Sequence, residues 1–233
     1  MGTSLSLPKV KIISSVFAVY EELNMPIEWL INSFTTLFVI MDPIGLAPIF
    51  LVLTQGMSKQ AKRAIAWRAT LVSACILVIF TLIGGAFLET LGISLPAFRI
   101  AGGLLLFWTA FEMIFEKRVE RKTGVAERTV SKSDIQNLAV FPLAIPLMAG
   151  PGTISATVLL ASNQREWIGL GYLIGIILVI LLLCYAIFIL ASQIDKFLGE
   201  MGRALLSRLL GVILAALAIQ FVVDGILAIA NTV

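Results

Sequence analysis

Two long apolar segments of this chain are each interrupted near the middle by helix-breaking residues. The first interruption consists of Asp42, Pro43, Ile44 and Gly45. The second consists of Gly150, Pro151, Gly152 and Thr153. Proline lacks a backbone donor and glycine weakens a helix, so the centre of a helix in a soluble core is a poor place for both. A broken membrane helix that lines a polar site tolerates them.

The composition indicates an integral membrane protein. Hydrophobic residues make up 59% of the chain and charged residues 13%, and the mean hydropathy is +1.02, above that of an ordinary soluble domain. A helix needs about 20 apolar residues to cross a bilayer. Six runs of this kind are present, at residues 30–54, 69–88, 96–115, 138–162, 168–192 and 209–230. They leave no loop long enough for a soluble domain, so an ion gradient or a separate protein must supply any energy.

The charged residues predict the orientation of the chain. If the loop after the first run is cytoplasmic, that side receives thirteen lysines and arginines and the opposite side four. The positive-inside rule then predicts that both termini lie on the outer side of the membrane. We expect this to be the plasma (inner) membrane, which the chain crosses several times. The net charge of +3 therefore reflects topology, and we expect no nucleic-acid partner. Residues 1–24 are expected to form a tail or an interfacial segment, since their resemblance to a signal peptide is weak.

An internal repeat is suggested by the spacing of the two interruptions. Pro43 and Pro151 are 108 residues apart, and Arg99 and Arg208 are 109 apart. Three spans in each copy would make the copies enter the membrane from opposite faces. We therefore expect an all-α membrane protein of six transmembrane helices, built as two inverted-topology three-helix repeats with the first and fourth helices broken at mid-membrane. The repeats would cover residues 25–116 and 137–233, joined by a charged cytoplasmic linker at 117–136.

Broken helices offer backbone groups to a ligand. A half-helix that begins near the midplane presents amides and a positive dipole end to an anionic group, whereas one that ends there presents carbonyls to a cation. A zwitterion such as an amino acid carries both charges. We therefore predict a substrate site formed by the two interruptions together with the Ser155 hydroxyl, although serine and threonine also bond back to their own helix.

Four residues are candidates for binding a coupling ion. A carboxylate in the middle of a span suggests a function by default, and Asp42 could hold a substrate ammonium, bind an ion, change protonation, or simply cap its half-helix. Glu112 is a second candidate, unless it points toward the basic loop at the end of its span. Gln220 and Asp224, one turn apart on the last span, complete the set, unless they are exposed at the interface.

Two residue types narrow the chemistry further. The chain has no histidine, which removes the usual proton shuttle and the commonest metal ligand. Cys75 and Cys184 lie in the second and fifth runs, and we expect them to pack as small residues without a mutual disulfide. We therefore expect no catalytic site, no metal site and no cofactor, with H⁺ or Na⁺ as the coupling ion.

Residues 41–50 and 142–154 resemble the motifs of the MarC family of bacterial and archaeal integral membrane proteins, which includes the small neutral amino acid transporter SnatA. The resemblance covers essentially the whole chain after residue 24. It implies transport of small neutral amino acids such as glycine and alanine, with an ion gradient involved. Family members often have asparagine at the position of Asp42, which favours a ligand role over a proton-carrying role for this carboxylate.

The sequence thus favours a secondary active transporter, such as a symporter, that works by alternating access. The alternatives are an exporter or a channel for another small polar solute, and a membrane accessory subunit that does not transport. An enzyme is disfavoured, because no span carries a nucleophile with a base or a pair of catalytic carboxylates. The oligomeric state is left open by the sequence.

Overall fold

The computed structural model describes residues 27–115, 139–162, 164 and 167–231, and this part of the chain is helical and contains no strand. The predicted tail at 1–24 and the predicted linker at 117–136 lie outside the described residues. A first helix covers residues 27–41. It is followed by α2 (Pro43–Leu53), α3 (Lys59–Thr90), α4 (Leu95–Ile114), the π-helix η1 (Ala139–Met148), α7 (Pro151–Ser162) and α8 (Trp167–Ala230).

Five stretches of the described chain are long and apolar enough to cross a membrane: Ile27–Leu53, Lys59–Thr90, Leu95–Ile114, Trp167–Ile194 and Ala204–Ala230. The last two are the arms of α8, which bends at Gly199, where φ is 62° and ψ is −178°. Such a positive φ favours glycine. The predicted fourth run forms two shorter helices instead, η1 and α7.

The form of η1 follows from its prolines. Pro142 and Pro146 supply no amide to a helical ladder. The helix widens, and the Ala149 amide donates to the Ala144 carbonyl, five residues back, at 2.9 Å. This is the hydrogen-bond spacing of a π-helix. The run at 138–162 therefore does not form one continuous α-helix.

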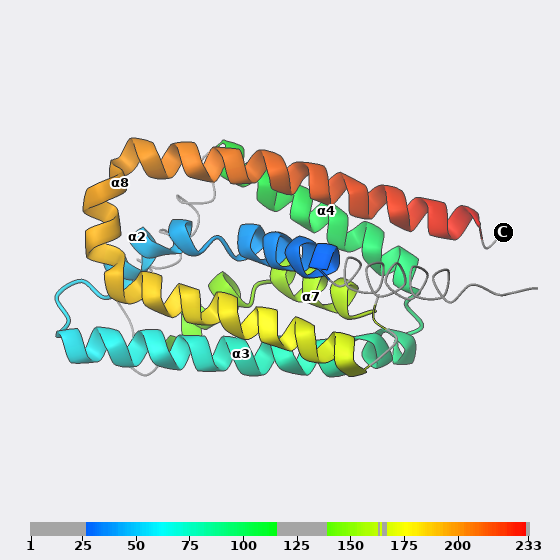
Figure 1. Cartoon of the computed structure of the whole chain (residues 1–233), viewed down its shortest axis with the longest axis horizontal. Coiled ribbons are helices and arrows are strands. Elements are labelled where there is room, and N and C mark those ends of the chain that lie inside the picture. The colour runs from blue at the N-terminus through cyan, green and yellow to red at the C-terminus, as the bar shows by residue number, and fades with distance from the viewer. Residues whose placement is uncertain (1–26, 116–138, 163, 165–166, 232–233) are drawn as a thin grey trace, which may run out of the picture.

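The interrupted helix lies at the centre of the molecule (Figure 1). The first arm of α8 runs beside α3, the second arm runs beside α4, and residues 27–41, α2 and α7 lie between these two pairs. Within the apolar window of Ile27–Leu53, 67% of the residues are buried, against 17–33% in the other four spans. The central helix is therefore shielded by the others.

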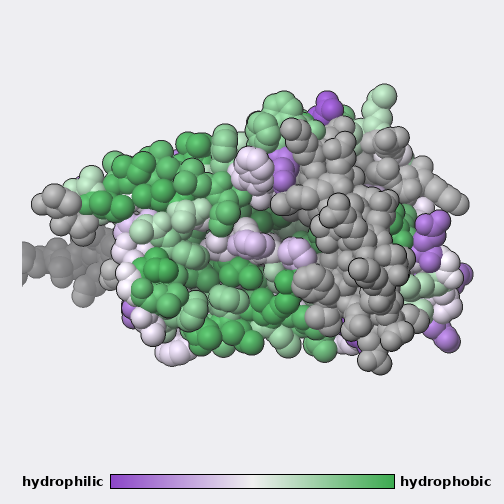
Figure 2. Space-filling view, turned by 180° about the vertical axis from the view of Figure 1, so that it is seen from behind, coloured by the Kyte–Doolittle hydropathy of each residue, from purple (hydrophilic) through white to green (hydrophobic). Residues whose placement is uncertain are grey.

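The outer helices expose large apolar side chains. Examples are Trp67 and Ile83 on α3, Trp108 on α4, and Leu182 and Leu209 on α8, each about half exposed. Green, apolar residues accordingly cover much of the coloured surface in Figure 2. In water so large an apolar surface would drive association, whereas hydrocarbon accommodates it. The surface is therefore that of a membrane protein.

Candidate functional site between the two helix interruptions

Asp42 separates residues 27–41 from α2 and closes the N-terminus of α2. Its backbone is left-handed, with φ 52° and ψ 64°, and the residue is 3% exposed. Its Oδ1 accepts a hydrogen bond from the Gly45 amide at 3.0 Å, and its carbonyl accepts one from the Leu46 amide at 3.1 Å. Pro43 follows at the first helical position, which its fixed φ suits. The chain thus buries a carboxylate at the start of a helix.

Gly45 makes this arrangement possible. A Cβ atom at position 45 would collide with the carboxylate of Asp42. Gly45 is half-buried, as is Ile44, whereas Asp42 and Pro43 are buried. Gly45 therefore has two roles: its amide donates the capping hydrogen bond, and its lack of a side chain leaves room for the Asp42 carboxylate.

The second interruption has a different chemistry. Gly150, which has no side chain, occupies the position before α7. The Gly150 carbonyl accepts a hydrogen bond from the Ile154 amide at 2.9 Å. A Cβ at position 150 would collide with the carbonyl oxygen of Pro146, so the close approach of η1 requires glycine. Pro151, at the first position of α7, is exposed. No carboxylate closes this helix from its cap position.

Two hydroxyl residues follow on α7, and both are buried: Thr153 is 3% exposed and Ser155 is 6% exposed. The carbonyl of Thr153 accepts from the Thr157 hydroxyl at 2.8 Å. Ser155 lies against α4, because a Cβ at Gly102 would be 3.3 Å from the Ser155 Cβ. The hydroxyls therefore lie inside the protein and do not face lipid.

Gly152 brings the two interruptions together. A Cβ at this position would lie 3.7 Å from Ile40 Cγ2, 3.3 Å from Leu106 Cδ2 and 3.8 Å from Thr109 Oγ1. Ile40 precedes Asp42 by two residues, and Leu106 is near the middle of α4. The start of α7, the end of the first helix and the centre of α4 thus meet at one place.

Glu112 lies one turn beyond Thr109 on α4. It is 5% exposed, and its Oε1 accepts from Trp108 Nε1 at 3.1 Å. The basic loop lies outside the described residues, so the alternative that this carboxylate points toward the loop stays an interpretation. Glu112 adds a second buried acid on the helix that contacts Gly152.

Gln220 and Asp224 share a face of α8, as the sequence predicts, and Gln220 Nε2 donates to Asp224 Oδ1 at 2.7 Å. The neighbouring residue Gly225 packs against the start of α4, since a Cβ there would be 2.9 Å from the carbonyl oxygen of Pro96. Gly152 meets α4 at Leu106 instead, about three turns further along the helix. The structure therefore does not bring this pair to the interruptions.

Packing between segments distant in the sequence places further residues near the first interruption, and the sequence did not predict these residues as part of the site. Cys184 is buried on α8, and its Sγ lies 3.4 Å from the Sδ of Met41, the residue before Asp42. Cys75 is exposed, and both cysteines are free, which confirms that they form no mutual disulfide. Ser33 and Ser73 are fully buried, and their hydroxyls have no hydrogen-bond partner among the described residues. A serine in an apolar helix gives no sequence signal of such burial.

Comparisons with known proteins agree with this membrane architecture. The family model described as "MarC family integral membrane protein" matches residues 27–230. A UPF0056 membrane protein of Archaeoglobus fulgidus is 38% identical over 200 residues, covering 83% of this chain and 90% of the relative. The UPF0056 membrane protein YhcE of Escherichia coli is 35% identical, covering 83% and 89%.

The match to a more distant relative covers nearly the full length of that relative. YvbG of Bacillus subtilis, also named a UPF0056 membrane protein, is 33% identical, covering 87% of this chain and 96% of the relative. No solved structure matches the chain. With a family model that covers almost all of the described helices, this multi-pass chain belongs to the MarC family of integral membrane proteins.

Proposed function

We propose that this protein is a secondary active transporter of small neutral amino acids of the glycine and alanine type, and that it works by alternating access in the plasma membrane. The observation that carries the proposal is the meeting of two unlike helix starts. The start of α2 is closed by the buried carboxylate of Asp42, whereas α7 starts beside Gly150, which has no side chain. Gly152 of α7 lies against Ile40, two residues from that carboxylate.

The two helix starts suit the two ends of an amino acid. Asp42 supplies a negative charge for the substrate ammonium group. The first amides of α7 have no partner within their own helix and carry the positive end of its dipole, so they suit the substrate carboxylate. The Thr153 hydroxyl, at the same end of α7, can donate a further hydrogen bond to that carboxylate. This assignment gives each interruption one half of the zwitterion.

Close packing at the start of α7 favours a small substrate. A single Cβ at Gly152 would lie 3.3 Å from Leu106, closer than ordinary van der Waals contact, and 3.7 Å from Ile40. In this proposal the helices must move apart to admit a substrate, and a small substrate requires the least movement. Leu106 is the twelfth residue of the 20-residue helix α4, and Asp42 is near the middle of Ile27–Leu53. Both positions support a site near the centre of the membrane.

The spacing of the helix starts supports an inverted repeat, and in this proposal the two repeats move against each other during alternating access. The helix starts at Lys59 and Trp167 are 108 residues apart, the same spacing as the first prolines of α2 and α7. Residues 139–162 would complete six crossings as a fourth, broken span, with both termini outside. The two halves would then move around the central site.

The alternatives make different predictions about exchange. A channel for a small polar solute would pass substrate without exchanging it, and an accessory subunit would pass none. An exporter would use the same site with opposite net flow. We propose no enzymatic activity and no cofactor, with H⁺ or Na⁺ as the coupling ion and Asp42 and Glu112 as the acids that bind it.

Counterflow tests the proposal. Purified protein in liposomes loaded with unlabelled alanine should accumulate external radiolabelled glycine or alanine, and small neutral amino acids should compete. Imposed sodium and proton gradients, applied separately, identify the coupling ion. Asp42→Ala should abolish accumulation, whereas Asp224→Ala, the same substitution away from the interruptions, should leave it. Absence of exchange by correctly inserted protein would overturn the transport proposal.

A further inference from the structure

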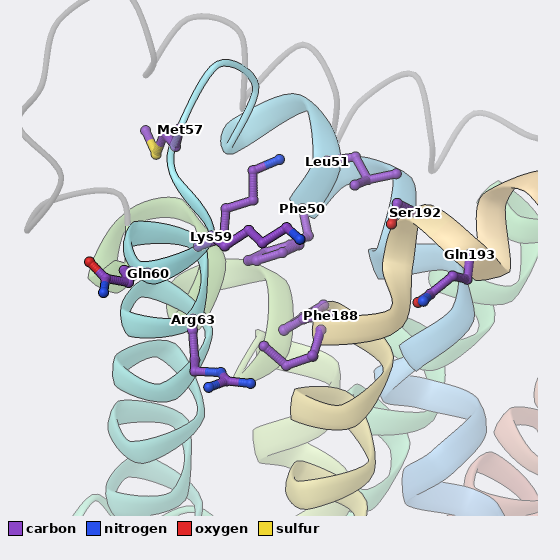
Figure 3. Close-up of a pocket in the computed structure, with 11 residues that line it drawn as sticks. Phe50, Leu51, Met57, Lys59, Gln60, Arg63, Phe188, Ser192 and Gln193 are labelled. Atoms are coloured by element: carbon purple, nitrogen blue, oxygen red, sulfur yellow. The ribbon is translucent and has the colours of Figure 1, made fainter.

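A cavity of about 520 Å³ opens where α2 ends and α3 begins (Figure 3). Three cations from the first turns of α3 line it, namely Lys59, Lys62 and Arg63. Ser192 and Gln193 of α8 line the opposite wall. We call this cavity the basic pocket. It is separate from the helix interruptions, because none of their residues lines it.

The charged residues among the described lining of the basic pocket are all positive. No aspartate or glutamate is among the described residues that line it. Figure 3 shows Lys59 and Arg63 reaching from α3 toward α2 and α8. Lysines and arginines three or four residues apart on a helix face one another and repel, and the positive dipole end of α3 adds to the same field. An anion in the pocket would relieve this repulsion.

The other walls of the basic pocket are apolar. Phe50 of α2 and Phe188 of α8 stack with their ring centroids 4.8 Å apart and their planes 14° apart. Leu51 and Ile189 continue this surface. A free inorganic anion gains nothing from apolar walls, whereas a lipid has a charged head and an apolar tail. The lining therefore fits an anionic amphiphile better than a soluble anion.

The position of the basic pocket fits a lipid head group. α3 has 32 residues, which is about 48 Å of helix, whereas the hydrocarbon core is ~30 Å thick. The charged first turns of α3 therefore extend into the head-group layer. Basic pockets between membrane helices on the cytoplasmic side bind anionic lipid heads. We propose that the basic pocket binds the phosphate group of an anionic phospholipid.

Native mass spectrometry of the full chain in neutral detergent tests this directly. Phosphatidylglycerol should bind the protein, and phosphatidylcholine should bind more weakly. Arg63→Gln and Lys62→Gln should each weaken phosphatidylglycerol binding about fivefold, the effect expected for one cation near an anionic surface. Arg68→Gln is the matched control, because Arg68 is exposed on the same helix but does not line the pocket.

Three outcomes would overturn the proposal. One is equal phosphatidylglycerol binding by Arg63→Gln and Arg68→Gln, and another is equal affinity for phosphatidylcholine. The third is full displacement of phosphatidylglycerol by millimolar inorganic phosphate, which would assign the pocket to a soluble anion. Because lipid binding is measured without substrate, the result is independent of the transport proposal.

Discussion

At the scale of single residues, Asp42 meets two demands with one short side chain. Its left-handed backbone is unfavourable for most residues, but aspartate and asparagine adopt it more readily. Its carboxylate also caps α2 through the Gly45 amide. Asparagine could meet both demands without the charge, so the two substitutions Asp42→Asn and Asp42→Ala separate structure from function.

We expect Asp42→Asn to fold with nearly unchanged stability, because the amide oxygen can still accept from Gly45. Asp42→Ala should lose about 1 kcal/mol through the missing cap and a further ~1 kcal/mol through the left-handed backbone. Thermal unfolding in detergent measures both losses. Equal stability of the two variants would contradict the capping role.

Transport by the same variants tests the charge. If Asp42 holds the substrate ammonium, Asp42→Asn should raise the concentration of alanine needed for half-maximal counterflow. If Asp42 is instead the group that carries a proton, Asp42→Asn should keep exchange but lose its response to a proton gradient. Unchanged exchange and coupling would remove Asp42 from the mechanism.

Sequence reasoning could predict the local features of the site but not its long-range contacts. Pro43 and Pro151 occupy the first positions of α2 and α7, the place where proline is favoured. The capping bond spans only three residues. The contact between Cys184 and Met41 spans 143 residues, and the burial of Glu112 depends on the helices around α4. Neither has a local signal in the sequence.

At the scale of helices, α4 and the second arm of α8 pack through glycines. A Cβ at Gly103 would be 2.7 Å from the carbonyl oxygen of Ala218, and a Cβ at Gly211 would be 2.9 Å from Met113 Cβ. Small residues let membrane helices approach this closely. The contact therefore depends on the absence of side chains at these positions.

Gly103→Ala should force the two helices apart and lower the unfolding temperature. Gly85→Ala is its control, because a Cβ at Gly85 of α3 would meet nothing within 4 Å, and alanine there should stabilise the helix by about 0.5–1 kcal/mol. Thermal unfolding of both variants in the same detergent measures the difference. A Gly103→Ala protein as stable as the parent would show that α4 and α8 are not closely packed.

The Phe50–Phe188 stack lies between the basic pocket and the neighbourhood of Asp42. Phe188 is one turn from Cys184, which contacts Met41 beside Asp42. Removal of one ring should therefore open a path from the pocket to the Cys184 thiol. We expect Phe50→Ala in a Cys75→Ser background to speed the reaction of Cys184 with a water-soluble maleimide several-fold.

Phe34→Ala controls for a general loosening of the protein. Phe34 stacks on Phe38 at 5.8 Å but does not line the basic pocket, so this change should leave the labelling rate unchanged. Equal acceleration by both substitutions would mean that the Phe50–Phe188 stack is not the barrier. Mass spectrometry of the labelled protein gives both rates.

A count of apolar residues does not predict the helical form of the fourth predicted span. Residues 138–162 have the length and hydropathy of a span, but their prolines widen the first part into η1 and α7 starts anew at Pro151. The sequence showed that the ladder must break there. It could not show that a π-helix would precede the break, because a helix can also accommodate proline by a kink.

At the scale of the whole molecule, the proposed orientation rests on the distribution of lysine and arginine. We expect the turn between α3 and α4 to face outward and the turn between α2 and α3 to face the cytoplasm. In a background with both cysteines replaced, Ile93→Cys should react with an impermeant maleimide in intact cells. Gln55→Cys should react only after the membrane is permeabilised. The opposite pattern would invert the topology.

The burial of the central helix has a consequence for how the protein is made. Ile27–Leu53 is the most buried of the five spans, yet the helices that shield it, α3, α4 and α8, are all synthesised after it. Until α8 leaves the ribosome, the carboxylate of Asp42 has no complete protein shell and must be sheltered by the insertion machinery, because hydrocarbon offers it no partner. Correct biogenesis therefore depends on a helix that is translated more than a hundred residues after Asp42, and a chain that stops before α8 should be a substrate for membrane proteases.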